Sequence, residues 1–301
     1  MLTTLGNLFA AEWLKLRRWP VAWALLGAFL SLLLLSQVLW ALVVALHHGA
    51  IGDVTIMALG PEQLAQIERQ LSFPGVFGAV LGQVNGVGGI LAIFLAAGSL
   101  GGDYSWGTLR TLLARAPARG VFLLAKLLAL LLALLLATLI ALAVGALVAL
   151  AVSAWLGLPS TFAWGDLLLL PVAIGRALFV ILPYLLATLA CAAWGRSVLA
   201  GVAGGLIFLA LDVGAGSLGA LGMVSDLALF AVNMLLQPNI NALVVQNSRL
   251  FGLDQSALAS ALDLALLPSP GQAALVVALY CALFGFAAWR WLARRDVGGA
   301  G

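Results

Sequence analysis

Six long apolar runs divide the chain, and each is long enough to cross the hydrocarbon core of a membrane as a helix. At a rise of 1.5 Å per residue, about 20 apolar residues cover the roughly 30 Å of that core. The third run is longer than a bilayer requires, so its helix should tilt or project beyond the membrane. We therefore predict an all-α integral membrane protein with six transmembrane helices, over residues 19–46, 76–100, 121–156, 167–194, 198–221 and 272–292.

The N-terminal segment carries a helical pattern of its own. Apolar residues recur at spacings of three and four and leave polar residues on the opposite side: Leu2, Leu5, Phe9, Trp13 and Leu16 against Thr3, Thr4, Asn7, Glu12 and Lys15. This spacing is typical of an amphipathic helix that lies in a membrane interface. We predict such an interfacial helix over residues 1–18. A poorly ordered tail with chance periodicity is the alternative.

Two longer connecting segments, residues 47–75 and 222–271, lie on the outer face of the predicted topology, and the second is only mildly polar. In the first, Pro61 precedes a short amphipathic stretch, which predicts a helix with proline in its first turn. In the second, residues 227–236 are apolar but too short to cross a bilayer. We predict interfacial or re-entrant structure there.

Composition excludes the soluble and disordered classes. Hydrophobic residues make up 64% of the 301 residues and charged residues only 8%, against about 25% charged residues in soluble domains. So few charges cannot cover a globular surface, and so much apolar surface cannot stay solvated. The two cysteines, Cys191 and Cys281, lie inside apolar runs and are typical of small core residues rather than of a disulfide or metal pair.

The basic residues predict the orientation of the spans. If both termini are cytoplasmic, all of the 14 basic residues except Arg69, Arg176 and Arg249 lie in inner segments or at inner helix ends. The positive-inside rule counts Lys and Arg in this way and favours that topology. The net charge of +3 then reflects cytoplasmic anchoring rather than binding to nucleic acid. We predict a multi-pass plasma-membrane protein, in bacteria a protein of the inner membrane.

The loop between the second and third spans has the most specific pattern. Leu109, Leu112, Leu113 and Ala116 share one helical face, and Pro117 ends the helix. Basic residues lie beside this apolar ridge. A short helix of this kind, over residues 107–116, fits a groove on a soluble partner. The same helix could equally lie on anionic lipid, held by its arginines.

This loop resembles the first cytoplasmic loop of ABC-2-type transporter permeases, the membrane subunits of type V ABC exporters. The resemblance extends to the charged residues before the first span and to the count of six spans with both ends inside. Asp103-Tyr104 stands where the family most often has Glu-Tyr. The residues that carry the resemblance are Glu12, Lys15, Arg17, Arg18, Gly102, Asp103, Tyr104, Gly107, Thr108, Leu109, Arg110, Leu112, Leu113, Arg115, Pro117, Arg119 and Lys126.

The resemblance implies an exporter driven by a separate P-loop ATPase, on which ATP and Mg²⁺ would bind; this chain would hold no cofactor of its own. Residues 1–18 would be the elbow helix. Two permease copies would associate, as a homodimer or with a similar chain, and each would bind an ATPase through its coupling helix. The docking residues would be Gly107, Thr108, Leu109, Arg110, Leu112, Leu113, Arg115 and Arg119.

Four polar residues within the predicted spans are candidates for a functional role. Gln83 and Asn85 could line a substrate path or simply bond to a neighbouring helix. Arg176 and Asp212 lie at similar distances from the tight turn at residues 195–197, which predicts a buried ion pair. That pair could be structural, or it could act as a gate or substrate contact.

Several catalytic motifs are absent from the sequence. No lysine follows a glycine, so a P-loop cannot occur, and the two histidines, His47 and His48, do not form a zinc-protease motif. We predict no catalytic residue and no metal site. The alternatives to a permease are a membrane-embedded enzyme, an assembly or scaffold protein, and an ion-coupled carrier that would depend on Asp212.

Overall fold

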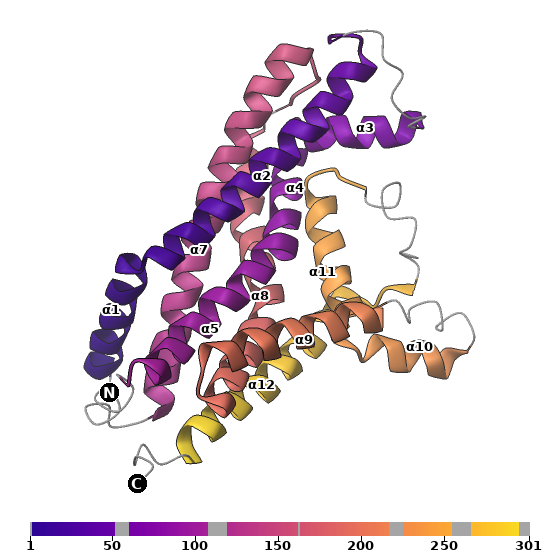
Figure 1. Cartoon of the computed structure of the whole chain (residues 1–301). Coiled ribbons are helices and arrows are strands. Elements are labelled where there is room, and N and C mark those ends of the chain that lie inside the picture. Colours follow the sequence, from indigo (N-terminus) through magenta and orange to yellow (C-terminus); the bar gives the residue numbers. More distant parts are fainter. Residues whose placement is uncertain are drawn as a thin grey trace.

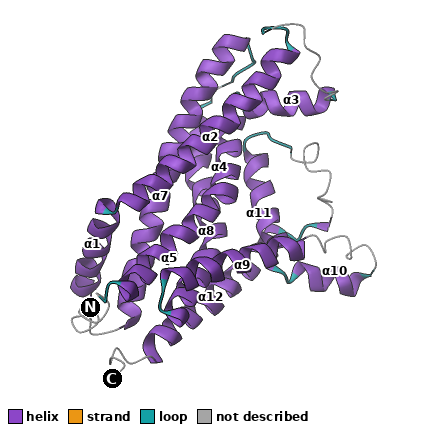
Figure 2. Ribbon diagram, in the orientation of Figure 1, coloured by secondary structure: helices purple, strands orange, loops and turns teal. Residues whose placement is uncertain are grey.

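The structure is a computed structural model that describes residues 2–51, 60–107, 119–161, 163–216, 225–254 and 266–294. Within these residues every regular element is a helix (Figure 2). Helices satisfy their backbone hydrogen bonds internally, which a chain with so little polar surface requires in an apolar environment. The predicted all-helical class is confirmed for the described part.

Six helical segments are long and apolar enough to cross a membrane. They agree with the six predicted spans within a few residues, except that α9 is described only to Gly216 and residues 217–221 lie outside the described part. The second is interrupted by one π-helical turn, η1. The segments are α2 (Pro20–His47), α4–η1–α5 (Gly75–Gln83, Val84–Gly88 and Gly89–Ser105), α7 (Arg119–Leu156), α8 (Trp164–Gly195), α9 (Val198–Gly216) and α12 (Pro270–Arg294).

The helix ends that the predicted topology places together do meet at one end of the bundle. Arg119, at the start of α7, donates from Nη1 to the carbonyls of Leu292 and Ala293 near the end of α12, at 2.9 and 2.7 Å. A Cβ added to Gly101 of α5 would lie 2.5 Å from the backbone of Val198, where α9 begins. Figure 1 shows the start of α1 and the end of α12 at this same end. Which side of a membrane this end faces stays a prediction.

Helix α8 lies at the centre of the bundle and is the most buried of the candidate spans, whereas few residues of α9 are buried. Small residues let α9 approach its neighbours. A Cβ on Gly201 would meet Ala97 and Ala192 at 2.9 Å, and one on Gly205 would meet Thr188 Oγ1 at 2.3 Å. These glycines form a close seam between α9, α5 and α8.

Two of the shorter helices lie where the sequence predicts helices outside the spans. Helix α1 (Leu2–Arg18) covers the predicted N-terminal helix and packs against α7. Helix α3 (Pro61–Gln70) begins at its proline, and the side chain of Gln63 accepts a hydrogen bond from the backbone of Gly60. Both helices therefore exist where the sequence predicts them; the interfacial role of α1 stays a prediction.

The segment before α12 contains a broken helix pair. Helices α10 (Asp226–Asn233) and α11 (Leu236–Leu250) meet at an angle of 73°, as the prediction of re-entrant structure allows. Helix α11 packs among α4, α8 and α12 (Figure 1). Composition alone favoured only an interfacial segment, because two amides of α11, Gln237 and Asn247, have hydrogen-bond partners on α8 that are distant in sequence.

Candidate functional site

A buried cluster of charged groups joins α1, α5 and α7; we call it the charged cluster, formed by Glu12, Lys15, Ser99, Asp103 and Lys126. The side chain of Lys126 is fully buried. Its Nζ donates to Glu12 Oε2 at 2.6 Å, to Asp103 Oδ2 at 2.8 Å and to the Ser99 carbonyl at 3.0 Å. Three acceptors therefore satisfy all three protons of the ammonium.

Lys15 completes the charge balance of the cluster. Its Nζ binds Asp103 Oδ1 and also donates to the carbonyl of Ser99 at 3.1 Å. Burial, together with the charge of Lys126, lowers the pKa of Lys15 below its ordinary value. Two ammonium groups then face two carboxylates, and a neutral, hydrogen-bonded set of this kind can persist out of water.

Helical spacing brings these groups together. Glu12 and Lys15 lie three residues apart on α1, and Ser99 and Asp103 lie four apart on α5, so each pair shares a face. Lys126 lies in the second turn of α7, with its ammonium 5.2 Å from the centre of the Phe122 ring. Lys126 Nζ also donates to the Ser99 hydroxyl at 3.2 Å. The arrangement can hold three helices together at one point.

The burial of this cluster is not evident from the sequence. The amphipathic pattern of residues 1–18 places Glu12 and Lys15 on a polar face, yet Glu12 is buried against Lys126. One signal was available: Asp103 and Lys126 lie within about two turns of the predicted helix ends on either side of the loop, and Glu12 and Lys15 lie within two turns of the end of the predicted N-terminal helix. Their pairing, however, depends on how three helices pack.

The predicted coupling helix over residues 107–116 lies almost wholly outside the described residues, which resume at Arg119. Gly107 has a φ of 68°, a left-handed conformation that suits glycine and turns the chain out of α5. Arg119, one of the predicted docking residues, donates to the last carbonyls of α12, and its contact with an ATPase stays a prediction. That position is favourable for a cation at a helix C-terminus. Thr108, Leu109, Arg110, Leu112, Leu113 and Arg115 lie outside the described part.

The predicted ion pair between Arg176 and Asp212 is wrong. Arg176 Nη1 donates to Asn247 Oδ1 of α11 at 3.1 Å, and Asn247 in turn donates to the Ala173 carbonyl at 2.9 Å. Similar depth was a poor guide, because the broken pair α10–α11 supplies polar partners between α8 and α9. The sequence predicted interfacial or re-entrant structure before the last span, but gave no sign that α11 would supply these partners.

Asp212 is held by neutral donors at the start of α11. Its Oδ2 accepts from the Tyr184 hydroxyl at 2.5 Å, and its Oδ1 accepts from the backbone N–H of Gln237 at 3.0 Å. The oxygen of Tyr184 lies 3.2 Å from Gln237 Oε1. We call Tyr184, Asp212 and Gln237 the Asp212 site. It fastens α9 to α8 and to the broken helix pair.

Gln83 and Asn85 flank the start of the π-helical turn η1. Gln83 Nε2 donates to Ser36 Oγ of α2 at 3.4 Å, which favours a role in helix–helix contact. Both polar atoms of the Asn85 amide are buried and have no hydrogen-bond partner within the described residues. Single π-turns are frequent at functional sites, so Asn85 is the stronger of the two path candidates.

Comparisons with known proteins add no identification. No family model, no curated protein and no solved structure matches the chain. Within the described residues no group of three or more His, Cys, Asp or Glu could hold a metal ion. The resemblance to ABC-2 permeases therefore depends on the residues of the loop and its flanks.

Proposed function

We propose that the chain is the membrane subunit of an ABC-2-type ATP-binding-cassette exporter. A separate P-loop ATPase would dock on residues 107–116 and would carry the ATP and Mg²⁺. Two permease subunits would form the transporter, as a homodimer or with a similar chain. Both termini would face the cytoplasm at the plasma membrane, and the N-terminal helix would lie in the membrane interface.

The observation that supports this proposal most is the position of the charged cluster. Asp103 lies four residues before Gly107, and Lys126 lies seven residues after Arg119, so the cluster joins the two helices on either side of the loop. It also joins both of them to α1 through Glu12 and Lys15. A force applied to the loop would therefore act on three helices as one body.

This linkage gives the docking loop a mechanical role. For ATP to drive transport, it must bind two states of the complex with different affinity, and a physical connection must carry that difference to the spans. Closure of an ATPase pair would displace the loop, and the charged cluster would pass the displacement to α1, α5 and α7. An enzyme or a scaffold has no need of such a connection.

The experiment is a pull-down of the full tagged chain from its native membranes. We expect a co-purified chain that contains the G-x-x-x-x-G-K-[ST] motif and hydrolyses ATP. Changing Leu109, Leu112 and Leu113 together to Glu should abolish its recovery, because three charges on the apolar ridge cannot enter a groove.

A matched control changes three leucines of the opposite connecting segment, Leu258, Leu262 and Leu264, to Glu. This variant should retain the ATPase. If the docking variant and the control retain equal amounts, the loop is not the docking site. If the wild-type chain recovers no P-loop protein, the exporter proposal is wrong.

A further inference from the structure

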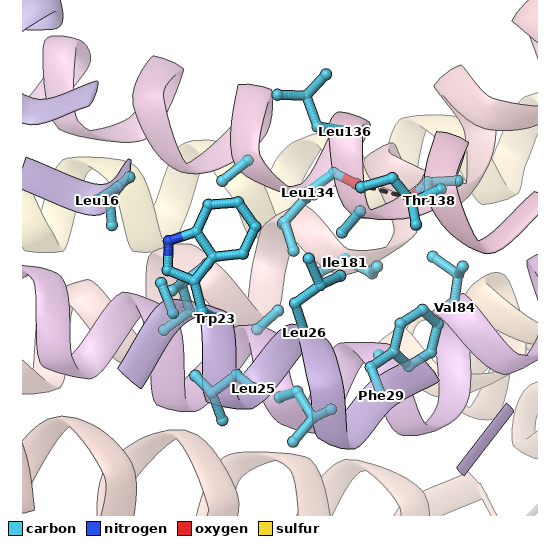
Figure 3. A pocket seen from close by; sticks show the side chains of 18 of the residues that line it. Leu16, Trp23, Leu25, Leu26, Phe29, Val84, Leu134, Leu136, Thr138 and Ile181 are labelled. Atoms are coloured by element: carbon cyan, nitrogen blue, oxygen red, sulfur yellow. Dashed lines mark hydrogen bonds between the residues drawn. The ribbon is translucent and has the colours of Figure 1, made fainter. Parts of the chain in front are cut away.

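An apolar cavity of about 240 Å³ lies between α1, α2, α7 and the second span. Its inner wall is buried and aliphatic or aromatic, with Phe29, Val84 and Ile181 all nearly inaccessible. The one hydroxyl on its wall, that of Thr138, donates to the Leu134 carbonyl at 2.8 Å (Figure 3). The cavity therefore offers almost nothing to water, which needs two to four polar partners.

The cavity opens sideways, toward the surface that a membrane would cover. Trp23 of α2 is 58% exposed, and Leu136 and Ile140 of α7 are about 40% exposed, although all three line the cavity. Figure 3 shows Trp23 on one side of it and Phe29 further along the same helix. Lining residues Ala22 to Phe29 cover about 10 Å along α2, a length suited to part of an extended acyl chain.

One end of the cavity carries an unpaired cation. Arg17, at the end of α1, lines it and is exposed, and no acidic partner binds its guanidinium within the described residues. Lys15, two residues earlier, is by contrast engaged by Asp103. The indole of Trp23 donates to the Arg17 carbonyl at 2.8 Å and so ties the mouth of the cavity to α2.

We propose that this cavity binds an anionic glycerophospholipid from the leaflet at the α1 end, with one acyl chain between α2 and α7 and the phosphate at Arg17. Guanidinium groups bind phosphate through paired hydrogen bonds, and basic positions between spans are typical of sites for anionic lipid. The lipid would be a resident ligand that joins α1, α2 and α7. The site does not depend on an ATPase partner.

The test uses the full chain, stripped of lipid in a neutral detergent and studied by native mass spectrometry. The probes are phosphatidylglycerol and phosphatidylcholine with identical acyl chains. We expect one phosphatidylglycerol to bind about tenfold more tightly than phosphatidylcholine, as a charge-assisted contact predicts. Arg17→Gln should remove this preference. The control Arg18→Gln, at the adjacent exposed arginine that does not line the cavity, should keep it.

A second pair of variants tests the acyl chain. Ala137→Phe fills the cavity from α7 and should weaken binding of both lipids by about tenfold. Ala143→Phe, on an exposed part of the same helix away from the cavity, should change neither. Unaltered binding in Ala137→Phe would overturn the cavity as the site. Equal losses in Arg17→Gln and Arg18→Gln would overturn the headgroup contact.

Fluorescence quenching by brominated lipid tests the same contact without a bulky substitution, in case Ala137→Phe does not fold. Phosphatidylglycerol with brominated chains should quench the fluorescence of the wild type more than that of Trp23→Phe, since the chain would contact this indole. Equal quenching would contradict the proposal. So would a detergent-stable dimer that binds no lipid, because the cavity would then be covered by a second copy.

Discussion

The charged cluster and the Asp212 site each bury a carboxylate, but they balance it differently. Asp103 faces two ammonium groups, Lys15 and Lys126, in a set whose charges cancel. Asp212 has no cation within ion-pair distance in the described part and accepts only from Tyr184 and the backbone of Gln237. The two sites are well separated, since Asp212 lies about 21 Å along α9 from Val198, the start of that helix.

This difference shows how each site contributes to stability. Partners in a buried, balanced set depend on one another, because removal of one leaves an uncompensated charge out of water. A buried carboxylate without a counter-ion lowers the free energy of unfolding, because its charge has been taken out of water. A neutral substitution removes that penalty. The charged cluster should therefore be intolerant of neutral substitutions, and the Asp212 site tolerant of them.

The largest effect is expected for Lys126→Met. It leaves Glu12 and Asp103 buried with Lys15 alone, at a cost of about 3–5 kcal/mol in the free energy of unfolding. Thermal unfolding in detergent measures it. The double variant Glu12→Gln with Lys126→Met restores neutrality and should recover part of the loss. A single variant as stable as the wild type would show that the cluster holds nothing together.

An intermediate effect is expected at the seam that positions Asp212. In Gly205→Val the new Cβ would lie 2.3 Å from Thr188 Oγ1 and 2.6 Å from Ile93 Cγ2, so α9 must move from α8. Overpacking of this kind costs about 1–3 kcal/mol. Gly214→Val on the same helix is the control, since nothing lies within 4 Å of its new Cβ. Equal shifts in the unfolding temperature would indicate only a loss of helix propensity.

A direct contrast comes from the same substitution at both carboxylates. Asp103→Asn should cost about 2–3 kcal/mol, since Lys126 loses a charged partner. Asp212→Asn should stay within about 1 kcal/mol of the wild type. Its new amide can donate to the Tyr184 oxygen, which can then donate to Gln237 Oε1 at the observed 3.2 Å, while the amide oxygen still accepts from the Gln237 N–H. Equal losses would mean that a cation balances Asp212.

The smallest expected effect is a pH dependence from Lys15. Its folded-state pKa lies below 10.5 because of burial and the nearby Lys126. The folded protein therefore loses this proton at lower pH than the unfolded chain does. The free energy of unfolding should then rise with pH between the folded-state pKa and about 10.5. Lys15→Arg keeps the cation but does not titrate in this range, so denaturant unfolding of the variant should lack that rise. Parallel curves would contradict the shift.

Much of the fold could be predicted from the sequence, because hydrophobicity and periodicity are local properties. The six apolar segments, the helix at residues 2–18 and the helix that begins at Pro61 all lie where the pattern places them. The burial of α11 could not be predicted, because its amides look like surface residues until their partners on α8 are known. The loop at residues 107–116 stays a prediction that the described residues do not test.

The sequence by itself determined six helical segments that are long and apolar enough to cross a membrane, and it contains a loop that resembles a docking helix. Only the tertiary structure decided which charges meet. Lys126 and Glu12 are 114 residues apart in the chain, and their contact depends on the rotation and depth of three packed helices. Residue counting predicts a similar depth for Arg176 and Asp212, yet they bind other groups because α11 lies beside both α8 and α9. The predicted depth of a residue along a helix follows from counting residues, whereas its hydrogen-bond partners depend on how the helices pack.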